Sequence, residues 1–80
     1  MYVGQNIAVR LIRKRTGEIT YGLYRPFRQN TSVLDEFETE QFADRVAEII
    51  ETRFAGSYSS TARRQAKRIA RREQSLDGTV

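Results

Sequence analysis

The sequence predicts an α+β fold in which an antiparallel sheet of three to four strands, opened by an N-terminal hairpin, packs against two C-terminal helices. Three observations lead to this fold: apolar residues alternate in the first third of the chain, an apolar stripe at helical spacing follows residue 39, and a thinner stripe follows residue 60. A chain of 80 residues is long enough for one domain with a small core. We therefore expect a single domain over residues 1–80, with a sheet (1–37), an acidic amphipathic helix (39–55), a basic helix (60–75) and a frayed tail (76–80).

The hairpin is the first predicted element. Apolar residues recur with a period of two over residues 6–14 and again over residues 19–23. The segment between them is short and contains Gly17, which can adopt the positive φ that a tight antiparallel turn needs. Pro26 then ends the second strand or places it at the sheet edge, because proline cannot donate to a strand ladder, and residues 28–31 are expected to form a polar loop.

A third strand is expected over residues 32–37, with Val33 and Phe37 on one side and Asp35 between them. Residues 1–3 are the candidate for a short additional edge strand.

Two helices follow the sheet. Thr39 is the expected N-cap of the first helix, Gly56 is its expected stop, and residues 57–60 form a linker that can cap the second helix. The second helix has a thin apolar stripe, so it either docks closely on the first or stays partly loose until it is bound. That stripe consists of Ala62, Ala66, Ile69 and Ala70. The core is expected to join the first helix to the hairpin through Phe42, Val46, Ile49, Ile50, Phe54, Ile7, Val9 and Leu11.

The composition argues against an enzyme. The chain has no cysteine and no histidine, so it lacks disulfides, the usual general base near neutral pH and the commonest neutral metal ligand. We expect no catalytic residues, no metal and no cofactor. No apolar run approaches the roughly 18 residues of a membrane span, and residues 1–12 lack the apolar stretch of a signal peptide. The expected protein is soluble, cytoplasmic and without membrane contact.

Charge is separated into blocks along the chain. Residues 1–31 carry six basic groups and one acid, residues 32–56 two basic groups and seven acids, and residues 57–80 six basic groups and two acids. Separated fields of this kind favour a protein that binds charged partners.

The basic helix is one candidate binding surface. Its cations lie on both sides of the apolar stripe, so that several can meet phosphates together. The alternative is that they pair with acids on one side of the first helix, which otherwise form a solvated face or imitate a row of phosphates. Those acids are Glu40, Asp44, Glu48 and Glu51. The candidate nucleic-acid or phosphate contacts are Arg63, Arg64, Lys67, Arg68, Arg71 and Arg72.

The sheet face opposite the helices is the other candidate. With Ile7, Val9 and Leu11 turned to the helices, it carries Ala8, Arg10, Ile12, Lys14, Thr20, Gly22 and Tyr24. Aromatic and aliphatic groups mixed with arginine are typical of a protein-binding or nucleic-acid-binding surface, although an ordinary outer face also has scattered apolar residues. The candidate partner-binding residues are Tyr2, Arg10, Ile12, Tyr21, Tyr24 and Arg25.

Three motifs together resemble a family of small phage-encoded anti-CRISPR inhibitors of type I-F surveillance complexes: NIAV at residues 6–9, EFETEQ at 36–41 and RRE at 71–73. The resemblance covers most of the chain in the same order. QAKRIA at 65–70, followed by EQ at 73–74 and GTV at 78–80, also looks like a segment of a second such inhibitor.

The resemblance implies a four-stranded sheet backed by two helices that binds the backbone subunits of an RNA-guided CRISPR effector complex and blocks target DNA. The guide RNA is a further candidate contact, and whether the protein touches nucleic acid directly stays open at this point. In that family an aromatic residue directly after the strand motif is important for binding, whereas Arg10 stands there in this chain. Tyr2, Tyr21 and Tyr24 are the nearby aromatic candidates.

A DNA-binding module of a mobile element is the alternative function. Phe37 and Thr39, followed by Ala43, also look like the sheet-and-helix arm-binding domains of phage integrases, whose sheet enters the major groove. An RNA-associated or ribosome-associated accessory protein is a third interpretation. The oligomeric state stays open, and a homodimer is one alternative.

Overall fold

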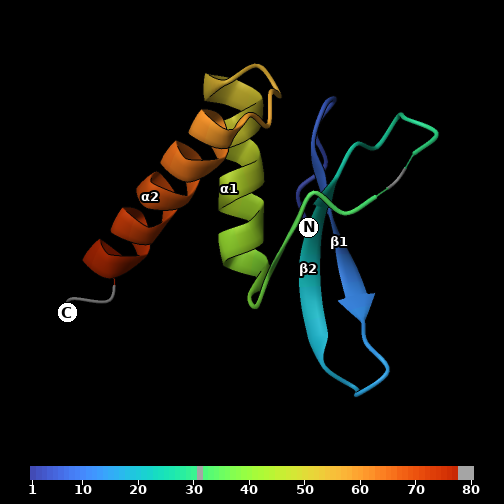
Figure 1. The fold of residues 1–80 in the computed structure, drawn as a ribbon. Coiled ribbons are helices and arrows are strands. Elements are labelled where there is room, and N and C mark those ends of the chain that lie inside the picture. The colour runs from blue at the N-terminus through green and yellow to red at the C-terminus, as the bar shows by residue number, and fades with distance from the viewer. Residues whose placement is uncertain (31, 78–80) are drawn as a thin grey trace.

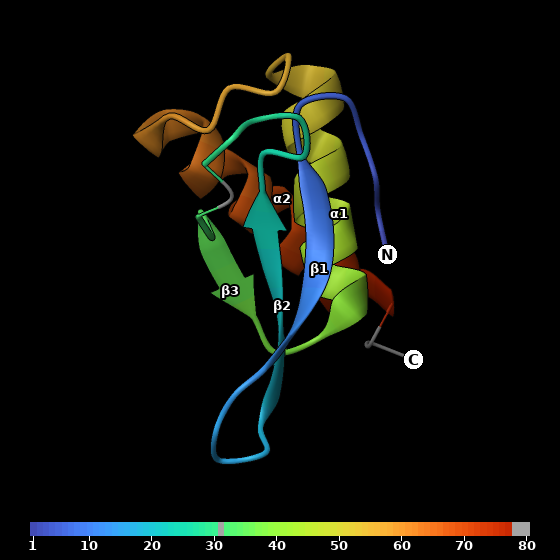
Figure 2. The same cartoon turned by 90° about the vertical axis from the view of Figure 1, so that its right-hand side faces the viewer.

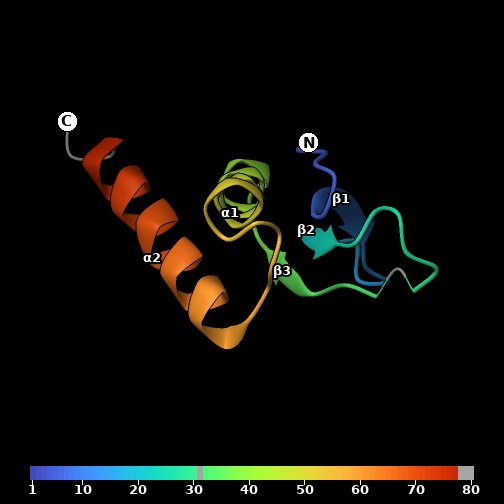
Figure 3. The same ribbon diagram turned by 90° about the horizontal axis from the view of Figure 1, so that it is seen from above.

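The computed structural model describes residues 1–30 and 32–77 and contains an antiparallel sheet followed by two helices. In Figure 1 the sheet lies on one side and the helices on the other, and Figure 3 shows α1 between the sheet and α2. The expected α+β class, with its N-terminal hairpin and two C-terminal helices, is confirmed. The elements are β1 (Ala8–Arg13), β2 (Ile19–Tyr24), β3 (Asp35–Phe37), α1 (Glu40–Arg53) and α2 (Ser60–Asp77), and the strand order is β1-β2-β3.

Strands β1 and β2 form the predicted hairpin. The Lys14 amide donates to the Glu18 carbonyl at 2.9 Å, and Gly17 has a φ of 91°, which glycine tolerates because it has no Cβ. The register pairs Arg10 with Gly22. Side chains of directly paired residues share a face, so the predicted composition of the sheet's outer face is confirmed.

The third strand is shorter than the sequence indicates, because β3 begins only at Asp35. Phe37 packs against the core, whereas the Val33 methyl groups lie against Gly22 on the outer face. The prediction that Val33 and Phe37 share one side is therefore wrong. A bend at Leu34 breaks the strand alternation between them.

The N-terminal residues add a single bridge between Val3 and Ala8 rather than a full strand. Within the described residues the sheet therefore has three strands, and the fourth strand that the resemblance implies is reduced to this bridge.

Helix α1 supplies the helical half of the core. The Phe42 amide donates to Oγ1 of Thr39 at 3.3 Å, which confirms the predicted N-cap, and Gly56, with a φ of 80°, donates to the Ile50 carbonyl at 2.9 Å where the helix stops. Phe42 and Phe54 lie partly buried at the edge of the core. The core cluster contains Ala43, Val46, Ala47, Ile49 and Ile50 from α1, Val9 and Leu23 from the sheet, and Ile7 directly before β1.

Leu11 does not belong to the buried core as predicted, because 43% of its surface is exposed. The far half of the hairpin projects past the helices, as Figure 2 shows. Leu11 and its neighbour across the ladder, Tyr21, lie on the helix side of the sheet, but α1 covers only the end of the hairpin that holds Ile7 and Val9.

Helix α2 docks on α1 through its alanine stripe. Ala62, Ala66 and Ala70 are at most 2% exposed, and the Ala62 amide donates to Oγ of Ser59 at 3.2 Å, as expected for a capping linker. The helix continues to Asp77, so residues 76 and 77 are helical rather than part of a frayed tail. Residues 78–80 of that predicted tail, and Thr31 of the predicted polar loop, lie outside the described residues. Neither helix, as far as it is described, has the length and apolar character needed to cross a membrane.

Candidate functional site

The outer face of the sheet brings an arginine and a tyrosine together. The guanidinium carbon of Arg10, on β1, lies 5.2 Å from the centre of the Tyr24 ring, on β2. This is a cation–π arrangement, and both side chains are half-buried. Because each residue stands on a hydrogen-bonded strand of the same hairpin, the pair is held at a fixed place on the face.

Next to this pair the outer face is apolar and close-packed. Ile12 and Val33 fold over Gly22: a Cβ added to this glycine would lie 2.6 Å from the Ile12 Cδ1 atom and 3.0 Å from a Val33 methyl group. Glycine therefore permits a close approach here that no larger residue allows without a shift of both neighbours.

The far end of the outer face is polar. Nζ of Lys14 lies 2.9 Å from the Glu36 carboxylate, which also accepts a hydrogen bond from Oγ1 of Thr20 at 3.2 Å. The hydrogen bond from Lys14 lowers the pKa of Glu36, and the same bond raises the pKa of Lys14. These charges largely satisfy one another.

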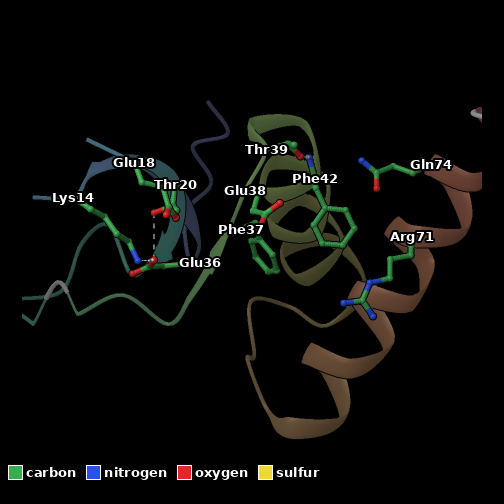
Figure 4. A pocket seen from close by; sticks show the side chains of 10 residues that line it. All are labelled: Lys14, Glu18, Thr20, Glu36, Phe37, Glu38, Thr39, Phe42, Arg71 and Gln74. Carbon is green, nitrogen blue, oxygen red and sulfur yellow. Dashed lines mark hydrogen bonds and ion pairs between the residues drawn. The ribbon is translucent and has the colours of Figure 1, made fainter. Parts of the chain in front are cut away.

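A hollow of about 470 Å³ surrounds the edge of β3 and separates this polar end from α2. Figure 4 shows Lys14 and Glu36 on one side of it and Phe42, Arg71 and Gln74 on the other. Its lining mixes both signs of charge with two aromatic rings, so it does not select one class of ligand.

The other predicted partner-binding residues lie away from the outer face. Tyr21 is on the helix side of the sheet. The backbone amide of Tyr2 donates to Asp44 of α1 at 2.8 Å. Arg25 donates to the carbonyl of Asn6 at 3.2 Å and to the carbonyl of Gly56. Of the six predicted residues, the structure thus gathers Arg10, Ile12 and Tyr24 on the outer face.

Two of the predicted phosphate contacts on α2 are committed to the fold through Asp35. Its Oδ2 atom lies 2.8 Å from Nζ of Lys67, accepts from Nε of Arg63 at 3.0 Å and from the Tyr58 hydroxyl at 2.8 Å. Partial burial raises the pKa of Asp35, but the hydrogen bonds from Lys67 and Tyr58 outweigh it and hold the pKa below its usual value. Burial and the neighbouring Asp35 raise the pKa of Tyr58.

The remaining arginines of α2 are less engaged. Arg71 stands 6.0 Å from the Phe42 ring centre, at the rim of the hollow. Arg64, Arg68 and Arg72 are exposed, and within residues 1–30 and 32–77 they make no hydrogen bond, ion pair or ring contact. We call these three residues the free arginine row.

The alternative, in which arginines of α2 pair with the acids of α1, does not hold among the described residues, because three of those acids bind the N-terminal segment and the fourth pairs within its own helix. Asp44 accepts the Tyr2 amide, and Glu51 accepts the amides of Asn6 and Ile7 at 2.8 and 3.0 Å. Burial raises the pKa of Glu51, but these hydrogen bonds outweigh it and lower the pKa overall. Glu40 lies 3.3 Å from the amino group of Met1, and Glu48 pairs with Arg45 of its own helix.

One exposed aromatic residue escaped the sequence reasoning. Phe27 is 80% exposed and, with Val3 at 71%, lines a shallow hollow of about 490 Å³ beside the N-terminal segment. The available signal was an aromatic residue placed directly after Pro26 in an otherwise polar segment.

No group of three or more carboxylate, histidine or cysteine side chains in the described part of the chain is arranged to hold a metal ion. The chain matches no protein-family model, no curated protein and no solved structure. The function is therefore proposed from the surfaces of this chain together with the resemblance of its sequence motifs.

Proposed function

We propose that this protein is a non-enzymatic inhibitor that binds an RNA-guided CRISPR surveillance complex through the outer face of its sheet and prevents target DNA from binding. The observation that carries the proposal is the Arg10–Tyr24 pair, held at 5.2 Å on a rigid hairpin. Tyrosine and arginine are among the residues enriched at the centres of protein interfaces.

The Arg10–Tyr24 pair also relates to the position at which this chain departs from the anti-CRISPR pattern, directly after the NIAV motif. Arg10 occupies the place where that family has an aromatic residue, and the Tyr24 ring lies directly against it. An aromatic group is thus present at this place on the sheet, supplied by the neighbouring strand. The apolar patch of Ile12 and Val33 over Gly22 adjoins it and extends the surface available to a partner.

Preorganisation supports binding by this face. The paired strands fix the backbone at both residues and the cation–π contact links their side chains, which reduces the conformational entropy lost on docking. The order of elements, a sheet followed by an acidic and then a basic helix, agrees with the order that the resemblance implies. The expected place of action is the cytoplasm of the host cell, where such complexes work.

A DNA-binding module of a mobile element is the second candidate, favoured by the free arginine row on α2. The two candidates differ in their response to salt. A complex that depends on phosphate contacts loses affinity steeply as the salt concentration rises. A stoichiometric protein complex that forms through the outer face of the sheet should persist at the same salt concentrations.

The test is target-DNA binding by a purified type I-F surveillance complex in the presence of this protein. The unaltered protein should abolish DNA binding, and the double variant Arg10→Ala with Tyr24→Ala should not. The matched control is Arg15→Ala with Arg28→Ala, which removes two exposed arginines and should inhibit fully.

Thermal unfolding must show that both double variants are folded. Full inhibition by the folded Arg10 and Tyr24 variant would move the interface away from the sheet. Failure of the unaltered protein to bind the complex, together with salt-sensitive binding to duplex DNA alone, would favour the second candidate.

A further inference from the structure

We infer that the outward face of α2 is a second binding site, which takes the phosphate backbone of a nucleic acid. It goes beyond the proposed function because it lies on a different face from the outer face of the sheet and requires no protein partner. Its central residues are the free arginine row, Arg64, Arg68 and Arg72.

The row points away from the body of the protein. Successive residues of a helix are separated by about 100° around its axis. The buried alanines of α2 recur at every fourth position from Ala62, and Arg64 and Arg68 fall on the opposite side, with Arg72 continuing the line. Four residues advance the helix by about 6 Å, so the guanidinium groups follow one another at regular intervals along an exposed edge.

No contact among residues 1–30 and 32–77 accounts for this row. Among residues 60–75 the sole acid is Glu73, whose carboxylate accepts two hydrogen bonds from Arg45 at 2.6 and 2.7 Å. Like charges four residues apart on a helix destabilise it. The row therefore weakens the isolated helix slightly, whereas Arg63 and Lys67 on the neighbouring side return stability by binding Asp35.

The chemistry of the face favours phosphate as the ligand. A guanidinium group donates two parallel hydrogen bonds to a phosphate, and arginine is preferred over lysine where this geometry matters. The other exposed residues here include Thr61 and Gln65, which are polar, and no exposed apolar residue accompanies them among residues 60–75. A protein interface would have an apolar centre, whereas contacts to a nucleic-acid backbone are made by such charged and polar groups.

The two surfaces can be occupied together. Figure 3 shows α1 lying between α2 and the sheet, so the outward face of α2 and the outer face of the sheet lie on different sides of the molecule. A nucleic acid on α2 would not cover Arg10 or Tyr24. The protein is thus built to hold a nucleic-acid strand on one side while the other side remains free.

The test uses the full chain with two labelled probes of equal length, a single-stranded RNA and a duplex DNA of mixed sequence, and measures affinity across a range of salt. The triple variant Arg64→Gln, Arg68→Gln, Arg72→Gln should bind at least tenfold more weakly than the unaltered protein. If all three contacts are lost, the slope of log affinity against log salt should fall in magnitude by about 2 for RNA and somewhat more for duplex DNA. Whichever probe binds more tightly identifies the source of the phosphates.

The matched control is Arg13→Gln, Arg15→Gln, Arg28→Gln. It makes the same change in net charge, from +4 to +1, with exposed arginines that lie off α2, and should lose clearly less affinity. Replacing the row with lysine should keep the salt slope but lose part of the affinity, because the positive charges remain while the paired guanidinium hydrogen bonds are lost. A retained salt slope separates lost contacts from misfolding. The Arg10→Ala, Tyr24→Ala variant should bind both probes normally, so failure of the proposed function is distinguishable from failure of this site.

Equal losses in the two glutamine variants would overturn the site, because net charge alone would then explain binding. Unchanged affinity in the α2 variant would overturn it as well. So would binding of a poly-glutamate chain that is as tight as RNA binding and equally sensitive to the row, since the face would then recognise any polyanion.

Discussion

Helices α1 and α2 of this protein use charge and burial in opposite ways. The interior face of α1 carries Val46, Ile49 and Ile50, all at most 1% exposed, whereas α2 buries a stripe of alanines. Asp44 and Glu51 of α1 accept backbone amides of the N-terminal segment, whereas three arginines of α2 are left unpaired among the described residues. The acids of α1 are thus used within the fold, whereas α2 combines engaged charges, such as Lys67, with three arginines that remain available.

The difference indicates which charged groups remain available to a partner. Charged residues that stabilise the fold bind a partner less readily, because the partner would have to compete with the intramolecular contacts that these residues already make. On this ground the acidic row of α1 is a poor candidate for phosphate mimicry, and the free row of α2 is a better candidate for phosphate binding.

The largest expected effect comes from the core of α1. Ile49→Ala should lower the free energy of unfolding by about 2 to 4 kcal/mol, because it removes three buried carbon atoms and leaves a cavity. Ile69→Ala on α2 should cost clearly less, since Ile69 is only partly buried. Urea unfolding measures both; equal costs would show that α2 belongs to the core as fully as α1 does.

Asp35→Asn should detach α2 more than it unfolds the sheet. The change weakens hydrogen bonds from charged groups of α2 and should cost about 1.5 to 3 kcal/mol. Hydrogen exchange should accelerate more in the amides of α2 than in those of β1 and β2. Uniform acceleration throughout the domain would mean that α2 does not open independently.

The same carboxylate makes the docking of α2 sensitive to acid. Because the folded protein holds the pKa of Asp35 below its usual value, its stabilisation is complete above the unfolded-state pKa of about 3.9 and is lost as pH falls through the lower folded value. Thermal unfolding followed from pH 6 down to pH 2 should show this loss, and the Asn variant should show a smaller one. If the melting temperature falls with pH in the same way in both proteins, Asp35 is excluded as a source of the acid sensitivity.

The two helix caps provide a smaller effect. Thr39→Ala should cost about 1 kcal/mol in the stability of the whole domain, because the Phe42 amide loses its acceptor. Ser59→Ala removes the corresponding acceptor of α2. Its cost should appear mainly as faster hydrogen exchange of the first amides of α2. A loss of unfolding free energy as large as that of Thr39→Ala would show that α2 unfolds together with α1.

Local features of this fold could be predicted from the sequence because they depend on neighbouring residues. The turn at Gly17, the cap at Thr39 and the stop at Gly56 follow from the conformations and hydrogen bonds that these residue types favour. The composition of the outer sheet face followed from strict alternation in β1 and β2.

Features that depend on distant packing could not be predicted in the same way. Leu11 fits the alternating pattern, yet its exposure depends on how far along the hairpin α1 extends. Asp35 reads as a residue between two apolar positions, and its role as a partner of Tyr58, Arg63 and Lys67 appears only once β3 meets α2. The bend at Leu34 likewise moved Val33 to the outer face.

The contrast between the helices is tested most directly by the stability of the Arg64→Gln, Arg68→Gln, Arg72→Gln variant in the absence of any ligand. If these charges are not used by the fold, its thermal transition should lie at or above that of the unaltered protein at low salt, because repulsion along α2 is relieved. The difference should shrink as salt screens the charges. A transition several degrees lower at every salt concentration would contradict this account, since it would show that the arginine row holds the fold together.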